Sequence, residues 1–259
     1  MLESLYAGAL EDARQRQREL PTAEVAQLAA EQTPALDAIA ALAPAEHIKV
    51  IAEVKRASPS RGTLAAIPDP QTLAQQYETG GASAISVLTE QRRFKGSLED
   101  LRNVRKAVSV PLLRKDFIRD EYQVYEARAA GADLTLLIVA GLSDGQLNEL
   151  FHQSLELGMT PLVETHSEAE VERAVDLGAE LIGVNARNLN TFELDRELFS
   201  RVADQIPAGV IRVAESAVLA VEDVERYAAA GADVVLVGEA LVTNDPLQTL
   251  EQYTRVRTK

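Results

Sequence analysis

The sequence predicts an α/β protein built as one (β/α)₈ barrel of the TIM type, with a helical extension in front of it. Three observations support this prediction: a chain of 259 residues, eight short apolar runs each followed by a helix-length segment, and a Gly-Ala sequence repeated before four of the runs. About 250 residues is a usual length for such a barrel. Eight βα units favour a closed barrel over an open doubly wound sheet, and no G-x-G-x-x-G or P-loop follows any run.

The predicted strands are short and apolar. They lie near residues 48–55, 84–88, 111–116, 134–139, 160–164, 181–185, 210–215 and 234–238. The repeated Gly-Ala sequence begins at Gly81, Gly131, Gly178 and Gly231. A glycine at these places can take the left-handed conformation that ends a helix, so the chain can turn directly into the next strand.

Capping residues mark the helix starts. The sequence places them at Asp69-Pro70, Ser97, Ser143 with Gln146, and Ser167 with Glu170. The last two pairs have the spacing of capping boxes.

Residues 1–47 do not follow the βα pattern, and we expect them to form a helical extension packed on a catalytic barrel of residues 48–259. Leu2, Leu5 and Tyr6 begin an apolar series with helical spacing, and Thr22 is a candidate cap for a second helix. The pattern leaves open whether the extension plugs the bottom of the barrel or covers its mouth.

The composition excludes several classes of protein. A formal net charge of −14 disfavours binding to nucleic acid or to an anionic membrane. Without cysteine there is no disulfide, thiolate nucleophile or cysteine metal site, and the three histidines lack metal-ligand spacing, so we expect no metal. No export signal or long apolar run is present, which predicts a cytoplasmic location.

Polar side chains stand at the downstream ends of otherwise apolar strands. Glu53 and Lys55 share one face of the first strand, and the same pattern places Lys115, Glu164, Asn185, Arg187 and Glu215 at the ends of later strands. In a barrel of this type the carboxyl ends of the strands form the active site, so these side chains should converge there. The alternative is a network of ion pairs that stabilises the mouth. That alternative is weaker, because desolvated charges stabilise little.

The loops after the first, seventh and eighth strands carry a phosphate signal. Ser58 follows the first strand, Ser216 follows the seventh, and Gly238-Glu239 leads from the eighth into a helix. Backbone N–H groups at such a helix start favour an anion.

Seven segments resemble, in order and spacing, the motifs of the indole-3-glycerol phosphate synthase family. They are IAEVKRASPSRG, GASAISVLTE, FKGSLEDL, PLLRKDFIRDEYQVYEARAAGAD, VETHSEAE, GVNARNL and VGEAL. The resemblance implies a carboxy-lyase of tryptophan biosynthesis that needs no cofactor. Its small-molecule substrate would be 1-(2-carboxyphenylamino)-1-deoxyribulose 5-phosphate, cyclised to indole-3-glycerol phosphate with loss of carbon dioxide and water.

The resemblance also implies roles for the site residues. Lys115 is the first choice for the general acid and Lys55 the second, because the sequence does not decide between two lysines near carboxylates. Glu164 fits the base, with Glu53 as its partner. The substrate-binding residues would be Asn185, Arg187, Glu215, Phe94 and Phe117, and the phosphate-binding residues Ser58, Ser216, Gly238 and Glu239.

Two positions depart from the family pattern. Ala217 stands where a glycine is usual, and its Cβ disfavours a positive φ, which leaves the phosphate-facing amide open. Ala186 replaces a polar residue between Asn185 and Arg187, but its opposite parity predicts that the change is tolerated.

Two rival functions are weaker. A phosphoribosylanthranilate isomerase would need a cysteine after the first strand, and the chain has none. A barrel that only binds a sugar phosphate would not need both an acid and a base. The sequence leaves the oligomeric state open, and a monomer is compatible with it.

Overall fold

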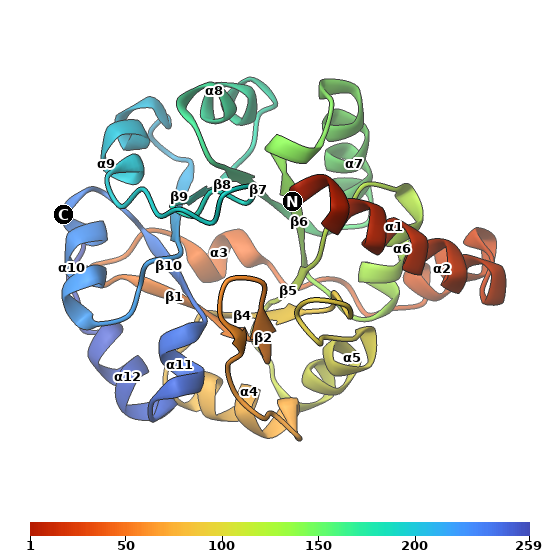
Figure 1. The fold of residues 1–259 in the computed structure, drawn as a ribbon, viewed down its shortest axis with the longest axis horizontal. Helices are drawn as coiled ribbons and strands as arrows, with labels where there is room; N and C mark the ends of the chain where they lie inside the picture. The colour runs from red at the N-terminus through yellow and green to blue at the C-terminus, as the bar shows by residue number, and fades with distance from the viewer.

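The computed structural model describes residues 1–259 and shows eight parallel strands closed into a barrel (Figure 1). The strands are β1 (Lys49–Val54), β4 (Ala84–Leu88), β5 (Leu112–Lys115), β6 (Leu134–Ile138), β7 (Thr160–Thr165), β8 (Leu181–Asn185), β9 (Ile211–Glu215) and β10 (Val234–Val237). The first strand pairs with both β4 and β10, which closes the sheet. The predicted (β/α)₈ barrel is therefore confirmed. A short antiparallel pair, β2 (Ala57–Ser58) and β3 (Gly62–Thr63), follows β1.

Helices surround the barrel on all sides (Figure 1). They are α4 (Pro70–Thr79), α5 (Leu98–Ala107), α6 (Glu121–Ala129), α7 (Asp144–Glu156), α8 (Glu168–Asp176), α9 (Leu198–Val202), α10 (Val221–Ala229), α11 (Glu239–Thr243) and α12 (Pro246–Tyr253), with short 3₁₀ turns η1 (Val139–Gly141) and η2 (Ala203–Gln205). The four glycines of the repeated Gly-Ala sequence have φ between 82° and 95°. Each one ends a helix in the left-handed conformation, as the sequence predicted.

The predicted caps are present, with one difference. Asp69, Ser97 and Ser143 cap their helices, and Ser143 forms the expected capping box with Gln146. Ser167 accepts a hydrogen bond from the Glu170 backbone N–H, but the predicted second box is absent. The Glu170 carboxylate turns instead to the backbone N–H of His166, at 2.8 Å.

The first 47 residues run along the whole height of the barrel. They contain α1 (Leu2–Glu19), α2 (Thr22–Ala30) and α3 (Ala38–Leu42). The α1 helix lies beside the carboxyl ends of the strands, where the Tyr6 hydroxyl donates to the Ile138 carbonyl at 3.4 Å. The α2 helix packs against α6, and the segment then crosses to the opposite end of the barrel (Figure 1).

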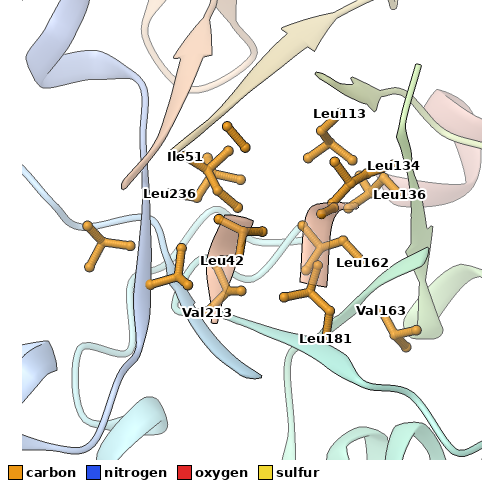
Figure 2. Packing of buried hydrophobic residues seen from close by; sticks show 14 of the residues in the cluster. Leu42, Ile51, Leu113, Leu134, Leu136, Leu162, Val163, Leu181, Val213 and Leu236 are labelled. Atoms are coloured by element: carbon orange, nitrogen blue, oxygen red, sulfur yellow. The ribbon is translucent and has the colours of Figure 1, made fainter. Parts of the chain in front are cut away.

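At that opposite end, α3 closes the barrel. Leu42 is fully buried, and Figure 2 shows it in the middle of a ring that includes Ile51, Leu162 and Val213. The extension therefore reaches both ends, so each of the two positions left open by the sequence is occupied by a different helix. Thr22 does not cap α2: Pro21 holds the cap position and makes no side-chain cap, while the Thr22 hydroxyl accepts from Gln17.

The core fills the lower part of the barrel with apolar side chains. Ile51, Leu113, Leu162 and Val213 point inward near the middle of their strands, and the polar residues come one alternation later along the same strands. Inside the barrel, the charged side chains therefore lie at the mouth and the apolar side chains lie below it. None of the helices is apolar over a length that would cross a membrane.

Candidate active site

A cavity opens at the carboxyl ends of the strands, and it brings together every site residue that the sequence predicted. It is lined by Glu53, Lys55, Ser58, Phe94, Lys115, Phe117, Glu164, Asn185, Arg187, Glu215, Ser216, Gly238 and Glu239. They come from seven of the eight barrel strands and the loops that follow them, with β6 as the exception. Convergence of these side chains agrees with the expected geometry, while the role of each remains a prediction.

Lys115 lies at the floor of the cavity between two carboxylates. Its Nζ is 3.0 Å from Glu164 Oε2 and 3.5 Å from Glu215 Oε2. Burial disfavours the ammonium form, but the attraction of Glu164, Glu215 and Glu53 outweighs it and raises the pKa of Lys115. Lys115 therefore carries a proton at neutral pH.

Glu164 and Glu215 are both buried, and their surroundings shift their pKa values in opposite directions. Burial favours the protonated form of Glu164, but Lys115 and His166 outweigh it and lower the pKa of Glu164. Burial and the neighbouring Glu164 charge both raise the pKa of Glu215. The two buried carboxyl groups therefore differ in acidity: Glu164 favours the ionised form and Glu215 the protonated form, a difference that suits a proton acceptor and a proton donor.

Neutral partners fix this arrangement. The Asn185 side-chain amide donates to Glu164 Oε1 at 3.1 Å, and the Asn185 carbonyl oxygen accepts from the Ser216 hydroxyl at 2.7 Å. Gly183 lies beside Glu215, and a side chain there would collide with the Glu215 carboxyl oxygen. The small residue at this position leaves room for the buried carboxyl group.

Lys55 and Glu53 form a second charged pair on β1. Lys55 Nζ is 2.5 Å from Glu53 Oε1. Both groups press against Gly238, where a Cβ would come within 2.8 Å of Lys55 Nζ and still closer to Glu53. The glycine after β10 is thus required by the ion pair on β1 and by the close approach of backbone to the cavity.

The loops after β9 and β10 present free backbone donors. The N–H groups of Ser216, Ala217 and Gly238 donate to no backbone carbonyl, and all three residues line the cavity. Ser216 and Ala217 have φ of 68° and 56°, so the chain keeps the left-handed conformation despite the alanine. Both residues therefore hold a left-handed turn that glycine would adopt without strain.

Arg61, which the sequence analysis did not select, lies at the same end of the cavity. Its guanidinium is 3.0 Å from Glu239 Oε1, an ion pair that joins the β2–β3 turn to the start of α11. An arginine in a Ser-Gly-Pro-rich loop gives no positional signal, because the alternation of a strand does not extend into the loop.

An aromatic wall lines another side of the cavity. The Phe94 and Phe117 ring centroids are 6.1 Å apart, and Tyr6 packs edge-on against Phe117 at 5.6 Å. Leu5 of α1 also lines the cavity. The extension thus supplies part of the site wall, a contribution that its helical periodicity alone could not reveal.

Arg187 is held in a bent loop after β8. Its backbone N–H donates to Asn185 at 3.0 Å, and its guanidinium donates to the Phe192 carbonyl at 3.2 Å. Burial lowers the pKa of Arg187 from its ordinary value, although Glu239 opposes this effect. Ala186, between Asn185 and Arg187, is buried. Its backbone N–H donates to the Glu215 carbonyl at 3.0 Å, which extends the pairing of β8 with β9.

A buried network behind the site holds the end of β5. Arg114 is fully buried on the face opposite to Lys115, and it donates to Asp116 at 3.0 Å and to the Gln123 carbonyl at 2.7 Å. Asp116 accepts from the Thr89 hydroxyl at 2.5 Å. This network fixes the backbone on both sides of Lys115.

No group of three or more His, Cys, Asp or Glu side chains has the arrangement of a metal site.

Comparison with known proteins gives a consistent result. A family model described as "Indole-3-glycerol phosphate synthase" matches residues 2–252. The chain is 65% identical over 253 residues to the indole-3-glycerol phosphate synthase of Leifsonia xyli subsp. xyli, covering 98% of this chain and 97% of that protein. It is 54% identical to the protein of the same name from Arthrobacter sp. strain FB24, covering 98% and 95% of the two chains.

A more distant likeness concerns the fold alone. A solved thiamine phosphate pyrophosphorylase from Pyrococcus furiosus superposes with a TM-score of 0.62 at 13% identity, covering 82% of this chain and 96% of that chain.

Proposed function

The chain belongs to the indole-3-glycerol phosphate synthase family, and from that premise we propose how its own residues carry out the family reaction. That reaction closes the indole ring of 1-(2-carboxyphenylamino)-1-deoxyribulose 5-phosphate and releases carbon dioxide and water. The single observation that carries the proposal is the cavity floor, where the Lys115 Nζ lies 3.0 Å from Glu164 and 3.5 Å from Glu215.

Ring closure needs an acid. The aromatic carbon that bears the carboxylate attacks the ketone carbon, and Lys115 gives its proton to the ketone oxygen as negative charge develops there. The new C–C bond interrupts the aromatic ring, and loss of carbon dioxide returns the bonding electrons to the ring. Lys55, held by Glu53 at 2.5 Å, is the second candidate for this step.

Dehydration needs a base and a second acid. Glu164 removes a proton from the ring-closed intermediate, and the former ketone oxygen leaves as water after it receives a proton from Lys115 or Glu215. The double bond that forms completes the indole. The opposite pKa shifts of Glu164 and Glu215 suit these two tasks.

The remaining residues would hold the substrate. The free N–H groups of Ser216, Ala217 and Gly238, with Ser58 and the start of α11 at Glu239, suit the phosphate. The wall of Phe94 and Phe117 suits the anthranilate ring. Arg187 would grip its carboxylate, Asn185 would help to orient the substrate, and Glu215 would accept hydrogen bonds from the sugar hydroxyls.

A direct assay tests the proposal. The protein is supplied with the carboxyphenylamino-deoxyribulose phosphate, and indole absorbance and fluorescence are followed over time. Turnover is expected without added metal or cofactor. Absence of indole product, with conversion of phosphoribosylanthranilate instead, would favour the isomerase. We further propose a cytoplasmic monomer, which fractionation of cells and light scattering of the purified protein would test.

A further inference from the structure

We propose that His166 is a positioning residue for Glu164: its ring, clamped between the carboxylates of Glu164 and Glu170, orients Glu164 and keeps it ionised for proton removal. The inference rests on the proposed function, because it concerns the step assigned there to Glu164.

The backbone places His166 for this contact. His166 follows β7 directly and lies two residues beyond Glu164, so both side chains leave the strand on the same side. Its Nε2 is 3.2 Å from Glu164 Oε1. On the other side of the ring, Nδ1 is 3.3 Å from Glu170 Oε2, the same oxygen that accepts the His166 backbone N–H at 2.8 Å.

The Glu170 carboxylate binds His166 and does not complete a capping box at the start of α8. The Ser-x-x-Glu spacing predicts a carboxylate that turns back to the Ser167 backbone, yet Glu170 reaches one residue further and holds both the backbone and the ring of His166. The His166 side chain is only 8% exposed. The ring is therefore held at Nδ1 by Glu170 of the α8 helix, while Nε2 faces Glu164 in an ion contact that lacks hydrogen-bond geometry.

The surroundings of Glu164 contain few positive charges to offset its burial. Lys115 of β5 is the one lysine in contact with it, Glu215 of β9 adds a competing acid, and Asn185 of β8 and Tyr6 of α1 face it without positive charge. Burial alone favours the protonated form of Glu164. An imidazolium on the opposite oxygen from Lys115 offsets that burial.

The surroundings of His166 support its charged form. Burial opposes the imidazolium, but Glu164 and Glu170 outweigh it and raise the pKa of His166 to about 9. The other charged groups near the ring, Glu193, Asp195 and Arg196, lie across a surface depression on the outer side of the β8–α9 loop.

The first experiment compares pH profiles of kcat and kcat/KM for the wild type, His166→Gln, Glu170→Gln and His152→Gln. His152 is a matched control, because its ring lies on the exposed face of α7, where it contacts the Asn148 carbonyl and packs edge-on against Phe151, away from the cavity. In His166→Gln the acid limb of kcat/KM should move up by about one pH unit, because Glu164 loses one of its two cationic partners. The kcat at neutral pH should fall roughly tenfold, because the carboxylate is no longer held in its orientation. KM should stay within about twofold.

Glu170→Gln should shift the acid limb in the same direction by a smaller amount, because the ring remains but loses its anchor. His152→Gln should superimpose on the wild type. An acid limb and a kcat that are both unchanged in His166→Gln would overturn the inference.

The second experiment follows the His166 ring nitrogens by NMR and works even if His166→Gln does not fold. A titration midpoint near 9 is expected in the wild type, with a lower midpoint in Glu170→Gln. A wild-type midpoint near the ordinary value of about 6.5 would contradict the clamp. A wild type that shows the high midpoint but no turnover of the carboxyphenylamino substrate would sink the proposed function and leave the His166–Glu170 contact intact.

Discussion

Lys115 is the residue whose surroundings bear most directly on the reaction. Its ammonium lies against two buried carboxyl groups whose pKa values are shifted in opposite directions, so replacing it removes the proposed proton donor and the main charge that lowers the pKa of Glu164. Lys115→Met, which keeps most of the side-chain volume, should lower kcat by roughly 10²–10⁴ with a smaller change in KM. Single-turnover fluorescence would measure the effect.

Lys106→Met is the matched control, because Lys106 is exposed on α5. Its kinetics should equal those of the wild type. The folded fraction of Lys115→Met has to be checked by circular dichroism, since the substitution leaves a buried carboxylate without its main partner. If a folded Lys115→Met retained full turnover, the acid role would pass to Lys55.

The left-handed backbone of Ala217 predicts that replacing this alanine with glycine stabilises the protein. Its φ of 56° costs an alanine about 1–2 kcal/mol, whereas glycine loses about 0.5–1 kcal/mol of chain entropy on folding. Ala217→Gly should therefore raise the free energy of unfolding by about 0.5–1 kcal/mol in urea titrations. Ala229→Gly, on an exposed helical position of α10, should lower it by about 1 kcal/mol. Equal destabilisation by both changes would refute the strain at Ala217.

The site residues that could be predicted from the sequence are those on strands. Alternation fixes which way Glu53, Lys115 and Glu215 point once the strands are assigned, so their convergence follows from the fold. Arg61 and His166 could not be found in this way. Their contacts depend on the path of a turn and on the side-chain choice of Glu170, and neither has a fixed period.

At the scale of elements, the β2–β3 turn is tied to α11 by a single ion pair between Arg61 and Glu239. The Arg61 side chain is 56% exposed, so the pair contributes at most about 1 kcal/mol. Arg61→Ala should speed amide hydrogen exchange in residues 57–63 by up to about fivefold and raise KM for the phosphate substrate by a similar factor. Hydrogen-exchange mass spectrometry and steady-state kinetics would measure the two effects.

The control for that prediction is Arg102→Ala, which removes an equally exposed pair with Glu99 on α5. It should leave the exchange of residues 57–63 unchanged. Identical exchange in Arg61→Ala and the wild type would show that the β2–β3 backbone pairing alone holds the turn.

Helix and strand assignments were accessible from the sequence because local signals and tertiary structure agree. The left-handed glycines and the caps at Asp69, Ser97 and Ser143 mark the elements correctly. The extension was harder to place. Its apolar spacing defines helices, but only contacts with residues far along the chain, such as Tyr6 with Ile138, decide which end of the barrel each helix reaches.

For the whole molecule, the titrating groups predict a stability that declines on both sides of its optimum. The pKa of His166 is raised to about 9, so its stabilising contribution is complete below about 6.5 and is lost as pH rises to about 9. The pKa of Glu215 is also raised, so its contribution to stability is likewise lost as pH rises, and this loss begins at a lower pH than that of His166. The pKa values of Glu164 and Asp223 are lowered, so their contributions are lost as pH falls below about 4.

Urea unfolding at a series of pH values would check this expectation. The slope between about pH 6.5 and 9 should be shallower in His166→Gln than in the wild type, and unchanged in His152→Gln. A slope that the His166 substitution does not alter would mean that the imidazolium is equally stable in the folded and unfolded chains.

The path of the first 47 residues has a consequence for synthesis. A ribosome releases α1 first, yet the groups that α1 packs against, Glu126, Ile138 and Gly141, are added only when about half of the 259 residues exist. The side chains of Leu2, Leu5 and Tyr6, which are buried in the folded protein, therefore have no surface to pack against during the first half of synthesis. Docking of this segment has to be a late event in cotranslational folding, and the apolar helix is a natural target for chaperones until then.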